Sequence, residues 1–370
     1  MHKNLLCGCH PLKGLWRKLS VKVLVVDDSA FMRKSISMML ESDRSIEVIG
    51  TARDGLEAIE KVKILKPDLM TLDVEMPRMD GITALKRVMK ESPLPVLMVS
   101  SVTKEGADAT IDAMAAGAVD FIPKQISYVS LDITNIKENL VAKVKSIANV
   151  RSRVFQRSPS AAPPAAVSPS AFASPNAKLI AIGISTGGPF SLQKVVPLLP
   201  ENFPLPVAIV QHMPPHFTKS LAERLDSISR LKVCEAEDGM EVASGKVFIA
   251  PGGFHLKFKD NGANTTISIS AFPQSSLHRP SVDVMFNSAL ETYGGDVLAV
   301  VMTGMGKDGL EGARSIKRAG GKVIAQDEES CVVYGMPKSI VDAHLADSVV
   351  PLEEIASTLV TAVCTAARQG

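Results

Sequence analysis

Short apolar runs alternate with helical patterns along most of the chain. Four runs in the first half are continuously apolar, as expected of parallel strands buried on both faces. They are Val21–Val26, Leu69–Leu72, Val96–Val99 and Val119–Ile122. Segments of helical composition and periodicity lie between them, at Phe31–Leu40, Leu56–Lys66, Ile82–Lys90 and Ala107–Ala116. The first half therefore predicts a parallel sheet built from repeated strand–helix units.

The second half shows the same alternation with one exception. Its predicted strands are Leu179–Gly183, Val207–Val210, Val247–Ala250, Val297–Met302 and Lys322–Ala325. Within residues 254–272, two strand-like segments flank Asn261-Gly262, which predicts a β-hairpin;. The predicted fold class is α/β, with two doubly wound parallel-sheet domains, the second Rossmann-like and carrying a hairpin insertion.

A segment rich in small residues and proline separates the two halves. The 22 residues from Gln156 to Ala177 include seven Ala, five Pro and five Ser, with Arg157 as the one charge. Such a composition cannot bury enough apolar surface to offset its ordering entropy. We expect a leader of uncertain structure at 1–20, one domain at 21–150, a linker at 151–177 and a second domain at 178–368.

Composition excludes several classes of protein. The 370 residues are 46% hydrophobic, enough for packed cores, and 41 Lys plus Arg against 39 Asp plus Glu leave a net charge of +2;. This balance does not favour nucleic acid as a partner. No apolar run reaches the roughly 18 residues of a membrane span. We expect a cytoplasmic protein without direct membrane insertion.

The five cysteines do not form a disulfide framework, because their number is odd and they are scattered;. Cys7, Cys9 and His10 are soft metal ligands, but no second cluster completes a tetrahedral set;. A disordered leader is the favoured interpretation of this segment.

Acidic residues stand at the ends of two predicted strands of the first half. Asp27 and Asp28 end one strand and Asp73 ends another, while Ser100 ends the third and Lys124 follows the fourth. In an open parallel sheet these ends share one edge. Three converging carboxylates favour a counter-ion such as Mg²⁺, and the hydroxyl and ammonium groups would complete a phosphoryl-transfer site.

Through these strand-end residues, the segment 21–145 resembles the receiver domain of bacterial two-component response regulators. The resemblance implies that Asp73 accepts the phosphoryl group, that Ser100 and Phe121 form a switch pair, and that a histidine kinase is the phosphodonor. It further implies a Mg²⁺ site for phosphorylation, formed by Asp28, Asp73 and the Glu75 carbonyl with Asp27 nearby. Receivers usually place proline after the lysine, whereas here Pro123 precedes Lys124 and Gln125 follows it.

A serine follows the first predicted strand of the second half. Residues 183–187 read GISTG, the pattern of a nucleophile exposed on a strand-to-helix turn, with Ser185 as the candidate;. His212 follows the next strand and is a candidate base, with His216, four residues further along the chain, as a rival. Asp308 follows a further strand and is a candidate for orienting the histidine.

The segment around Asp308 also supports a different function. Gly304, Gly306 and Gly309 spell G-x-G-x-x-G between a strand and a helix, and Asp327 ends the next strand. This is almost the complete dinucleotide-binding fingerprint. The order Ser, His, Asp also differs from that of α/β-hydrolases. On these motifs alone, a nicotinamide-binding domain therefore remains an alternative interpretation.

The second half, residues 178–368, resembles the catalytic domain of chemotaxis protein-glutamate methylesterases. The matching segments read ISTGGP, QHMPP, RPSVD and TGMGKDG. The resemblance implies a Ser185, His212 and Asp308 triad, supported by Thr186 and the Met305 N–H. It implies hydrolysis of glutamate methyl esters on methyl-accepting chemoreceptors, with release of methanol, and deamidation of specific receptor glutamines. No cofactor is implied for ester hydrolysis.

The segment from Arg279 to Asp283 is interpreted as a helix start. Ser281 is the expected cap, and the buried face would comprise Val282, Met285, Phe286 and Ala289;. Arg279 is a candidate substrate contact. The alternatives that remain are a receiver joined to a DNA-binding module, a receiver-controlled dehydrogenase and a catalytically silent receptor-binding scaffold.

Overall fold

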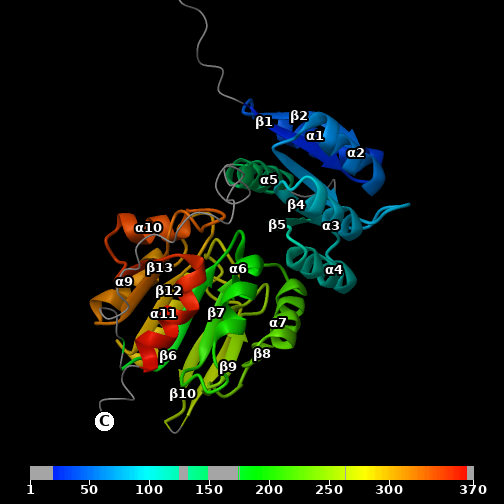
Figure 1. Ribbon diagram of the computed structural model, residues 1–370. Coiled ribbons are helices and arrows are strands. Elements are labelled where there is room, and N and C mark those ends of the chain that lie inside the picture. The colour runs from blue at the N-terminus through cyan, green and yellow to red at the C-terminus, as the bar shows by residue number, and fades with distance from the viewer. Residues whose placement is uncertain (1–19, 125–131, 149–173, 175, 263, 365–370) are drawn as a thin grey trace, which may run out of the picture.

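Two parallel sheets with helices on both faces make up the protein (Figure 1). The computed structural model describes residues 20–124, 132–148, 174, 176–262 and 264–364. Nearly all of the predicted leader and linker, the Cys7, Cys9 and His10 cluster, and the Lys124–Gln125 peptide lie outside the described residues.

The N-terminal sheet has five parallel strands in the order β2-β1-β3-β4-β5. They are β1 (Val21–Val26), β2 (Ile46–Ala52), β3 (Leu69–Asp73), β4 (Val96–Ser100) and β5 (Asp120–Pro123). The sequence predicted four of these strands and missed β2. The reason is that β2 lies at the edge of the sheet and is fully buried only at its two ends, so it lacks a continuous apolar run.

Five helices cover this sheet. They are α1 (Ala30–Glu41), α2 (Gly55–Leu65), α3 (Gly81–Glu91), α4 (Lys104–Ala115) and α5 (Asp132–Ala148). Helices α1 and α5 pack on one face, and α2, α3 and α4 pack on the other. The first four begin after N-cap residues whose side chains accept a backbone hydrogen bond, namely Ser29, Asp54, Asp80 and Thr103;. Each cap marks the residue after which its helix begins.

The C-terminal sheet has seven parallel strands in the order β14-β13-β12-β6-β7-β9-β8. They are β6 (Leu179–Ile184), β7 (Val207–Gln211), β8 (Lys232–Glu235), β9 (Lys246–Ile249), β12 (Val297–Val301), β13 (Lys322–Gln326) and β14 (Ser348–Val350). Strands β8 and β14 were not predicted, because both are short edge strands with exposed positions. The predicted hairpin is confirmed as the antiparallel pair β10 (His255–Asp260) and β11 (Thr265–Ser270).

The helices of the C-terminal domain also fall on two faces. Helices α6, α7 and α11 pack on one face, whereas α8, α9, α10 and the hairpin pack on the other. Their bounds are α6 (Gly188–Val195), the 3₁₀ turn η2 (Val196–Leu198), α7 (Phe217–Ile228), α8 (Val282–Tyr293), α9 (Leu310–Arg318), α10 (Met336–Asp342) and α11 (Leu352–Cys364). Helix α8 starts after Ser281 and buries the predicted face.

The two domains are in direct contact. Helix α4 of the first domain packs against α6 and α7 of the second (Figure 1). The ring of Phe121, in β5, stacks on that of Phe217, the first residue of α7, with the centroids 4.4 Å apart and the planes 13° from parallel. One buried hydrophobic cluster therefore includes residues of both domains.

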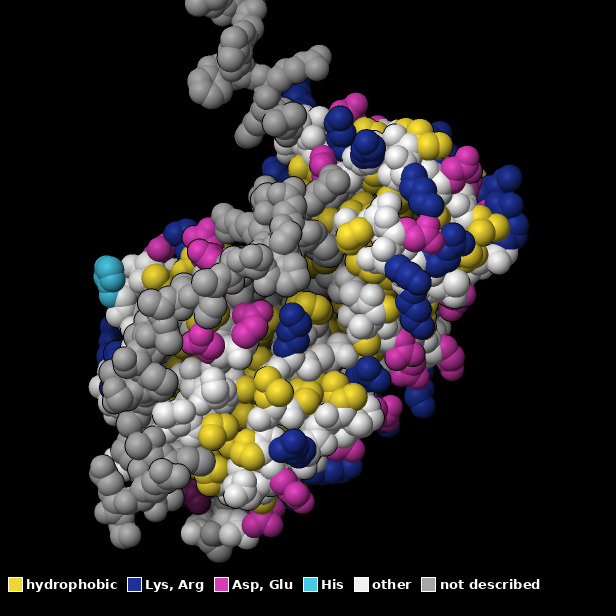
Figure 2. Space-filling model, in the orientation of Figure 1, with side chains coloured by type: hydrophobic (Ala, Val, Ile, Leu, Met, Phe, Trp, Pro, Cys, Tyr) yellow, Lys and Arg dark blue, Asp and Glu magenta, His cyan; other side chains and the backbone are white. Residues whose placement is uncertain are grey.

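Charges of both signs are interspersed on the face seen in Figure 2. This arrangement fits the small net charge and offers no basic stripe on that face for a nucleic-acid backbone;. Among the helices that the structure describes, none is both long enough and apolar enough to cross a membrane.

Candidate active site and acidic pocket

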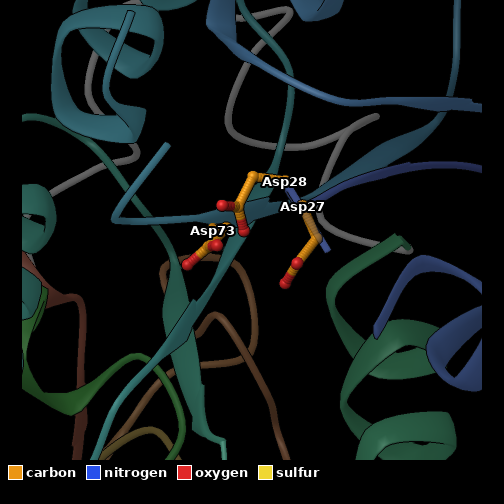
Figure 3. Close-up of side chains that lie close together, drawn as sticks. All are labelled: Asp27, Asp28 and Asp73. Atoms are coloured by element: carbon orange, nitrogen blue, oxygen red, sulfur yellow. The ribbon is translucent and has the colours of Figure 1, made fainter. Parts of the chain in front are cut away.

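The three aspartates predicted at strand ends meet at one edge of the N-terminal sheet (Figure 3). Strands β1 and β3 are parallel neighbours, so Asp27 and Asp28 emerge beside Asp73. One carboxylate oxygen from each lies within 4.8 Å of the others. Asp27 and Asp73 are buried and Asp28 is exposed. Hard oxygen ligands with one side open to water fit Mg²⁺, which keeps several of its waters when bound to protein.

Lys124 supplies the nearest positive charge. Its Nζ lies 2.7 Å from Asp73 Oδ2 and 3.1 Å from Asp27 Oδ2. Burial and the neighbouring Asp27 nevertheless raise the pKa of Asp73 to about 6, against the opposing effect of Lys124;. Burial lowers the pKa of Lys124, but its two ion pairs outweigh this effect and the net shift is upward. The three carboxylates therefore carry more negative charge than Lys124 neutralises, and this excess favours binding of a cation.

The other predicted residues of this pocket lie close by. The backbone N–H of Glu75 donates to Asp73 Oδ1 at 3.3 Å, and the role of its carbonyl as a ligand stays a prediction. Ser100 ends β4, is fully buried and donates to the Gly106 carbonyl at 3.0 Å. Phe121 is 4% exposed, with one face of its ring against Phe217. The predicted switch pair thus connects the pocket with the domain contact.

Replacing Asp73 with asparagine is expected to stabilise the metal-free N-terminal domain at pH 7.5 by about 1–3 kcal/mol. The pKa of Asp73 is raised in the fold from 3.8 to about 6. Protonated Asp73 therefore makes its whole contribution to the free energy of unfolding below pH 3.8, and this contribution is lost as the pH rises through 6;. Denaturant unfolding with EDTA at pH 5 and pH 7.5 measures this effect. A variant less stable than wild type at pH 7.5 would contradict the expectation.

The serine and histidine candidates stand at neighbouring strand ends of the C-terminal sheet. Ser185 directly follows β6 and His212 directly follows its parallel neighbour β7. Their backbones are held by hydrogen bonds from Ser185 N to the Thr303 carbonyl at 3.0 Å and from His212 N to the Ile184 carbonyl at 3.2 Å. The two residues therefore occupy fixed, adjacent positions.

Asp308 lies against the histidine. His212 Nε2 is 2.8 Å from Asp308 Oδ2, and the two side chains are 9% and 10% exposed. Asp308 also accepts from Ser281 Oγ at 3.0 Å and from the N–H groups of Val282 and Asp283 at 2.7 and 3.0 Å. Burial alone would raise the pKa of Asp308, but His212 and these donors hold it below its usual range. Asp308 is therefore ionised and fixed at the start of α8.

The remaining ring nitrogen of His212 is the one left for the serine. Among the described residues, His212 Nδ1 is buried and has no hydrogen-bond partner. The rival His216 is exposed at the start of α7. The geometry thus favours His212 over His216 as the base for Ser185.

The glycine-rich loop packs against Ser185. A Cβ on Gly304 would lie 2.8 Å from the Cβ of Ser185, and Gly309 has φ of +97° before α9. Thr303 Oγ1 donates to the Thr186 carbonyl at 2.9 Å, and Met305 is half-buried in the same loop. Gly304 is explained by close packing against the serine, and Gly306 and Gly309 by positive φ angles of 85° and 97°;. Their spacing therefore does not require a bound dinucleotide.

The acidic residue of the fingerprint has a local role as well. Asp327 Oδ1 accepts hydrogen bonds from the backbone N–H of Ser330, at 3.0 Å, and from its hydroxyl. Asp327 therefore stabilises the turn that follows β13.

Sequence reasoning missed three side chains around this site. His278 stacks on His212, with ring centroids 4.2 Å apart and planes 22° from parallel. Gln211 Nε2 donates to the carbonyls of Ser185 and His212 at 3.0 and 3.3 Å. His255 is fully buried and accepts from the backbone N–H of Ser281 at 3.2 Å. The signal for His278 was its position directly before the RPSVD segment, and the signal for Gln211 was its place as the first residue of the QHMPP segment.

Arg279 and Asp283 have observed structural roles. The Arg279 carbonyl accepts from Gly253 N at 3.1 Å, and its side chain is exposed. Asp283 Oδ1 accepts from Gly312 N at 2.7 Å, linking α8 to α9. The proposed contact of Arg279 with substrate stays a prediction.

The acidic pocket of one domain and the serine, histidine and aspartate of the other define a class of protein, a hydrolase joined to a receiver. The model of the CheB methylesterase family matches residues 180–359, and the response regulator receiver domain model matches residues 23–133.

Relatives match almost the whole chain. A protein-glutamate methylesterase/protein-glutamine glutaminase 1 of Oleidesulfovibrio alaskensis is 49% identical over 366 residues, covering 93% of this chain and 99% of the relative. One of Thermotoga maritima is 47% identical over 340 residues, covering 92% and 98%. This chain belongs to the family of protein-glutamate methylesterase/protein-glutamine glutaminases.

Solved structures are similar to each half. The CheB methylesterase catalytic domain of T. maritima is 50% identical with a TM-score of 0.49, covering 50% of this chain and 97% of that one. The response regulator domain of T. maritima CheB is 48% identical with a TM-score of 0.33, covering 35% and 97%. Because the chain belongs to this family, the two alternatives of a DNA-binding regulator and a dehydrogenase are set aside.

Proposed function

We propose that this protein hydrolyses glutamate γ-methyl esters on chemoreceptors and deamidates specific receptor glutamines, under control of phosphorylation at Asp73. The observation that carries the proposal is the 2.8 Å contact of His212 with Asp308 at the strand end beside Ser185, in a chain of this family. The remaining nitrogen of His212 has no partner among the described side chains. A buried histidine oriented by a carboxylate is the arrangement that activates a serine hydroxyl.

Ser185 Oγ attacks the ester carbonyl of the receptor glutamate while His212 Nδ1 takes the hydroxyl proton. The carbonyl π electrons move to oxygen, and backbone N–H groups near Thr186 and Met305 stabilise this oxyanion. His212 then returns the proton to the methoxy group, which leaves as methanol. The acyl-enzyme remains on Ser185.

Water hydrolyses the acyl-enzyme by the same route. His212 removes a proton from the water, the hydroxide adds to the acyl carbonyl, and the Ser185 oxygen leaves with the proton that His212 returns. Asp308 stabilises the imidazolium in both halves of the reaction, since it remains ionised at low pKa;. With a glutamine substrate, ammonia replaces methanol as the leaving group.

The receiver controls this reaction through its contact with the catalytic domain. Helix α4 packs on α6 and α7, the helices that follow Ser185 and His212 along the chain. A histidine kinase of the chemotaxis pathway phosphorylates Asp73. Asp27, Asp28 and Asp73 would hold Mg²⁺ in this pocket, and the ion would supply neutralisation of the phosphoryl charge;. The phosphoryl group adds a charge of about −1.5 to −2 and draws Ser100 toward it. Phe121 then repacks and its contact with Phe217 is weakened.

Removing residues 1–150 is expected to raise basal methanol release roughly tenfold. This increase corresponds to about 1.4 kcal/mol of free energy by which the receiver favours the covered over the open catalytic domain. The deleted segment carries α4 and Phe121, which cover α6 and α7. Circular dichroism and thermal unfolding establish that the shortened chain is folded. The same truncation with Ser185→Ala is the control for contaminating esterases. Unchanged or lower activity in a folded truncation would contradict occlusion by the receiver.

The proposed function is tested with chemoreceptor membranes carrying isotopically labelled methyl esters. Release of labelled methanol reports the esterase, and mass spectrometry of receptor peptides reports conversion of glutamine to glutamate. Wild-type protein should carry out both reactions. If phosphorylated protein carried out neither reaction on several receptors, the assignment would change to a receptor-binding scaffold.

A further inference from the structure

We propose that His278 is a positioning residue for ester hydrolysis, whose ring fixes the orientation of the His212 imidazole toward Ser185. The inference rests on the proposed function and deepens it. Its basis is the ring stack between the two histidines, together with the way the His278 segment is fastened to Asp308.

The hydrogen bond to Asp308 does not by itself fix the orientation of the His212 ring. The hydrogen bond from Nε2 to Asp308 fixes one corner of the imidazole. Histidine side chains have a broad second torsion, so the ring is free to tilt about that corner. His278 covers one ring face at a centroid distance of 4.2 Å. This contact restricts the tilt and keeps Nδ1 in its buried position.

The segment that carries His278 is anchored on both sides. The following residue, Arg279, accepts a hydrogen bond from Gly253 N at 3.1 Å through its carbonyl. Ser281 N donates to His255 Nδ1 at 3.2 Å, and His255 Nε2 lies 3.1 Å from the Pro273 carbonyl. Ser281 Oγ donates to Asp308 at 3.0 Å. The same short segment therefore supports the carboxylate at one edge of His212 and the ring on its face.

His278 is suited to this role because it stays neutral. Burial, followed by the nearby charge of His212, lowers the pKa of His278 to about 4, with Asp308 opposing the shift. Two positive charges on rings stacked this closely would repel each other;. A neutral partner avoids this repulsion when His212 takes the serine proton.

Replacing His278 with alanine is expected to lower kcat for methanol release by about 10- to 100-fold and to leave KM within about twofold, because small misplacements of a reacting group have effects of that size. His278→Phe keeps a flat ring without an exchangeable proton and should retain kcat within about threefold of wild type. Leu277→Ala is the matched control, since Leu277 precedes His278 and is 91% exposed. It should behave like wild type.

Nuclear magnetic resonance provides a readout that needs no substrate. In protein with ¹⁵N-labelled histidine, the proton between His212 and Asp308 should give a low-field signal, assigned by its loss in His212→Gln. The signal should persist in wild type and His278→Phe and should broaden by exchange in His278→Ala.

Two outcomes overturn the inference. One is a His278→Ala enzyme with wild-type kcat and an unchanged signal. The other is a His278→Phe enzyme as slow as His278→Ala, with the His212 signal sharp in both, since the ring would then act through its nitrogen atoms. Absence of methanol release by wild type would instead contradict the proposed function, and the signal in His278→Ala would still decide the positioning role.

Discussion

Ser185→Ala is expected to lower methanol release from methylated receptors by a factor on the order of 10⁵–10⁶, the scale found when a serine hydrolase loses its nucleophile. The hydroxyl forms the acyl-enzyme, and alanine has no nucleophilic atom in its place. The Cβ of Ser185 packs against Gly304, and alanine keeps that contact. The substitution should therefore remove turnover without unfolding the chain. The measurement is the initial rate of methanol release, with thermal unfolding as the check on folding.

Ser275→Ala is the matched control for this experiment. Ser275 is an exposed serine of the same domain, so its replacement should leave the rate unchanged. A Ser185→Ala enzyme that keeps a rate within about tenfold of wild type would show that another group is the nucleophile.

Asp308→Asn is expected to lower kcat by about 10³–10⁴. The carboxylate holds the proton on His212 Nε2 and stabilises the imidazolium that forms when Ser185 attacks. An amide in its place loses the negative charge and favours the wrong tautomer of His212. Asparagine retains one oxygen for the Ser281 and Asp283 donors at the start of α8, so the fold should survive with a lower unfolding temperature. Steady-state kinetics should show kcat falling far more than KM changes.

Asp283→Asn distinguishes this effect from simple damage to α8. Asp283 lies at the same helix start, where its side chain accepts from Gly312 N and interacts with Asp308, whereas Asp308 is the carboxylate that pairs with His212. Its replacement should lower kcat by less than about tenfold. Equal losses in the two variants would indicate that Asp308 acts only as a structural residue.

The sheet interiors were predictable, whereas their edges were not. Buried central strands such as β6 and β12 carry continuous apolar runs, as expected of a parallel sheet covered on both faces;. The edge strands β2, β8 and β14 have exposed positions, so hydrophobicity alone did not separate them from loops. Their existence depends on pairing with a neighbour that is distant in sequence.

Much of the candidate site followed from one rule, that parallel strands bring their carboxyl ends to one edge. This rule placed Asp27 near Asp73 and Ser185 near His212 without knowledge of their contacts. His278 was missed because it lies in the connection after the hairpin and not at a strand end. Its position depends on bonds between separate loops, such as Gly253 to Arg279.

The contact between the domains was also beyond sequence reasoning. The resemblance to receivers singled out Phe121 as a switch residue, but nothing in the pattern indicated Phe217 as its neighbour. Both aromatic residues fit the core of their own domain, and only the assembled chain shows that their rings stack. The stack joins the predicted switch to the helix that follows His212.

The central claim is that phosphorylation of Asp73 opens a Ser185-dependent methylesterase. The most direct test is methanol release from labelled chemoreceptor membranes by wild type and Asp73→Asn, each with and without a small-molecule phosphodonor and Mg²⁺. The account predicts that phosphodonor accelerates the wild type and has no effect on Asp73→Asn, and that Ser185→Ala releases no methanol in either condition. Equal acceleration of Asp73→Asn, or wild-type release that does not respond to phosphodonor while Asp73 is shown to be phosphorylated, would contradict it.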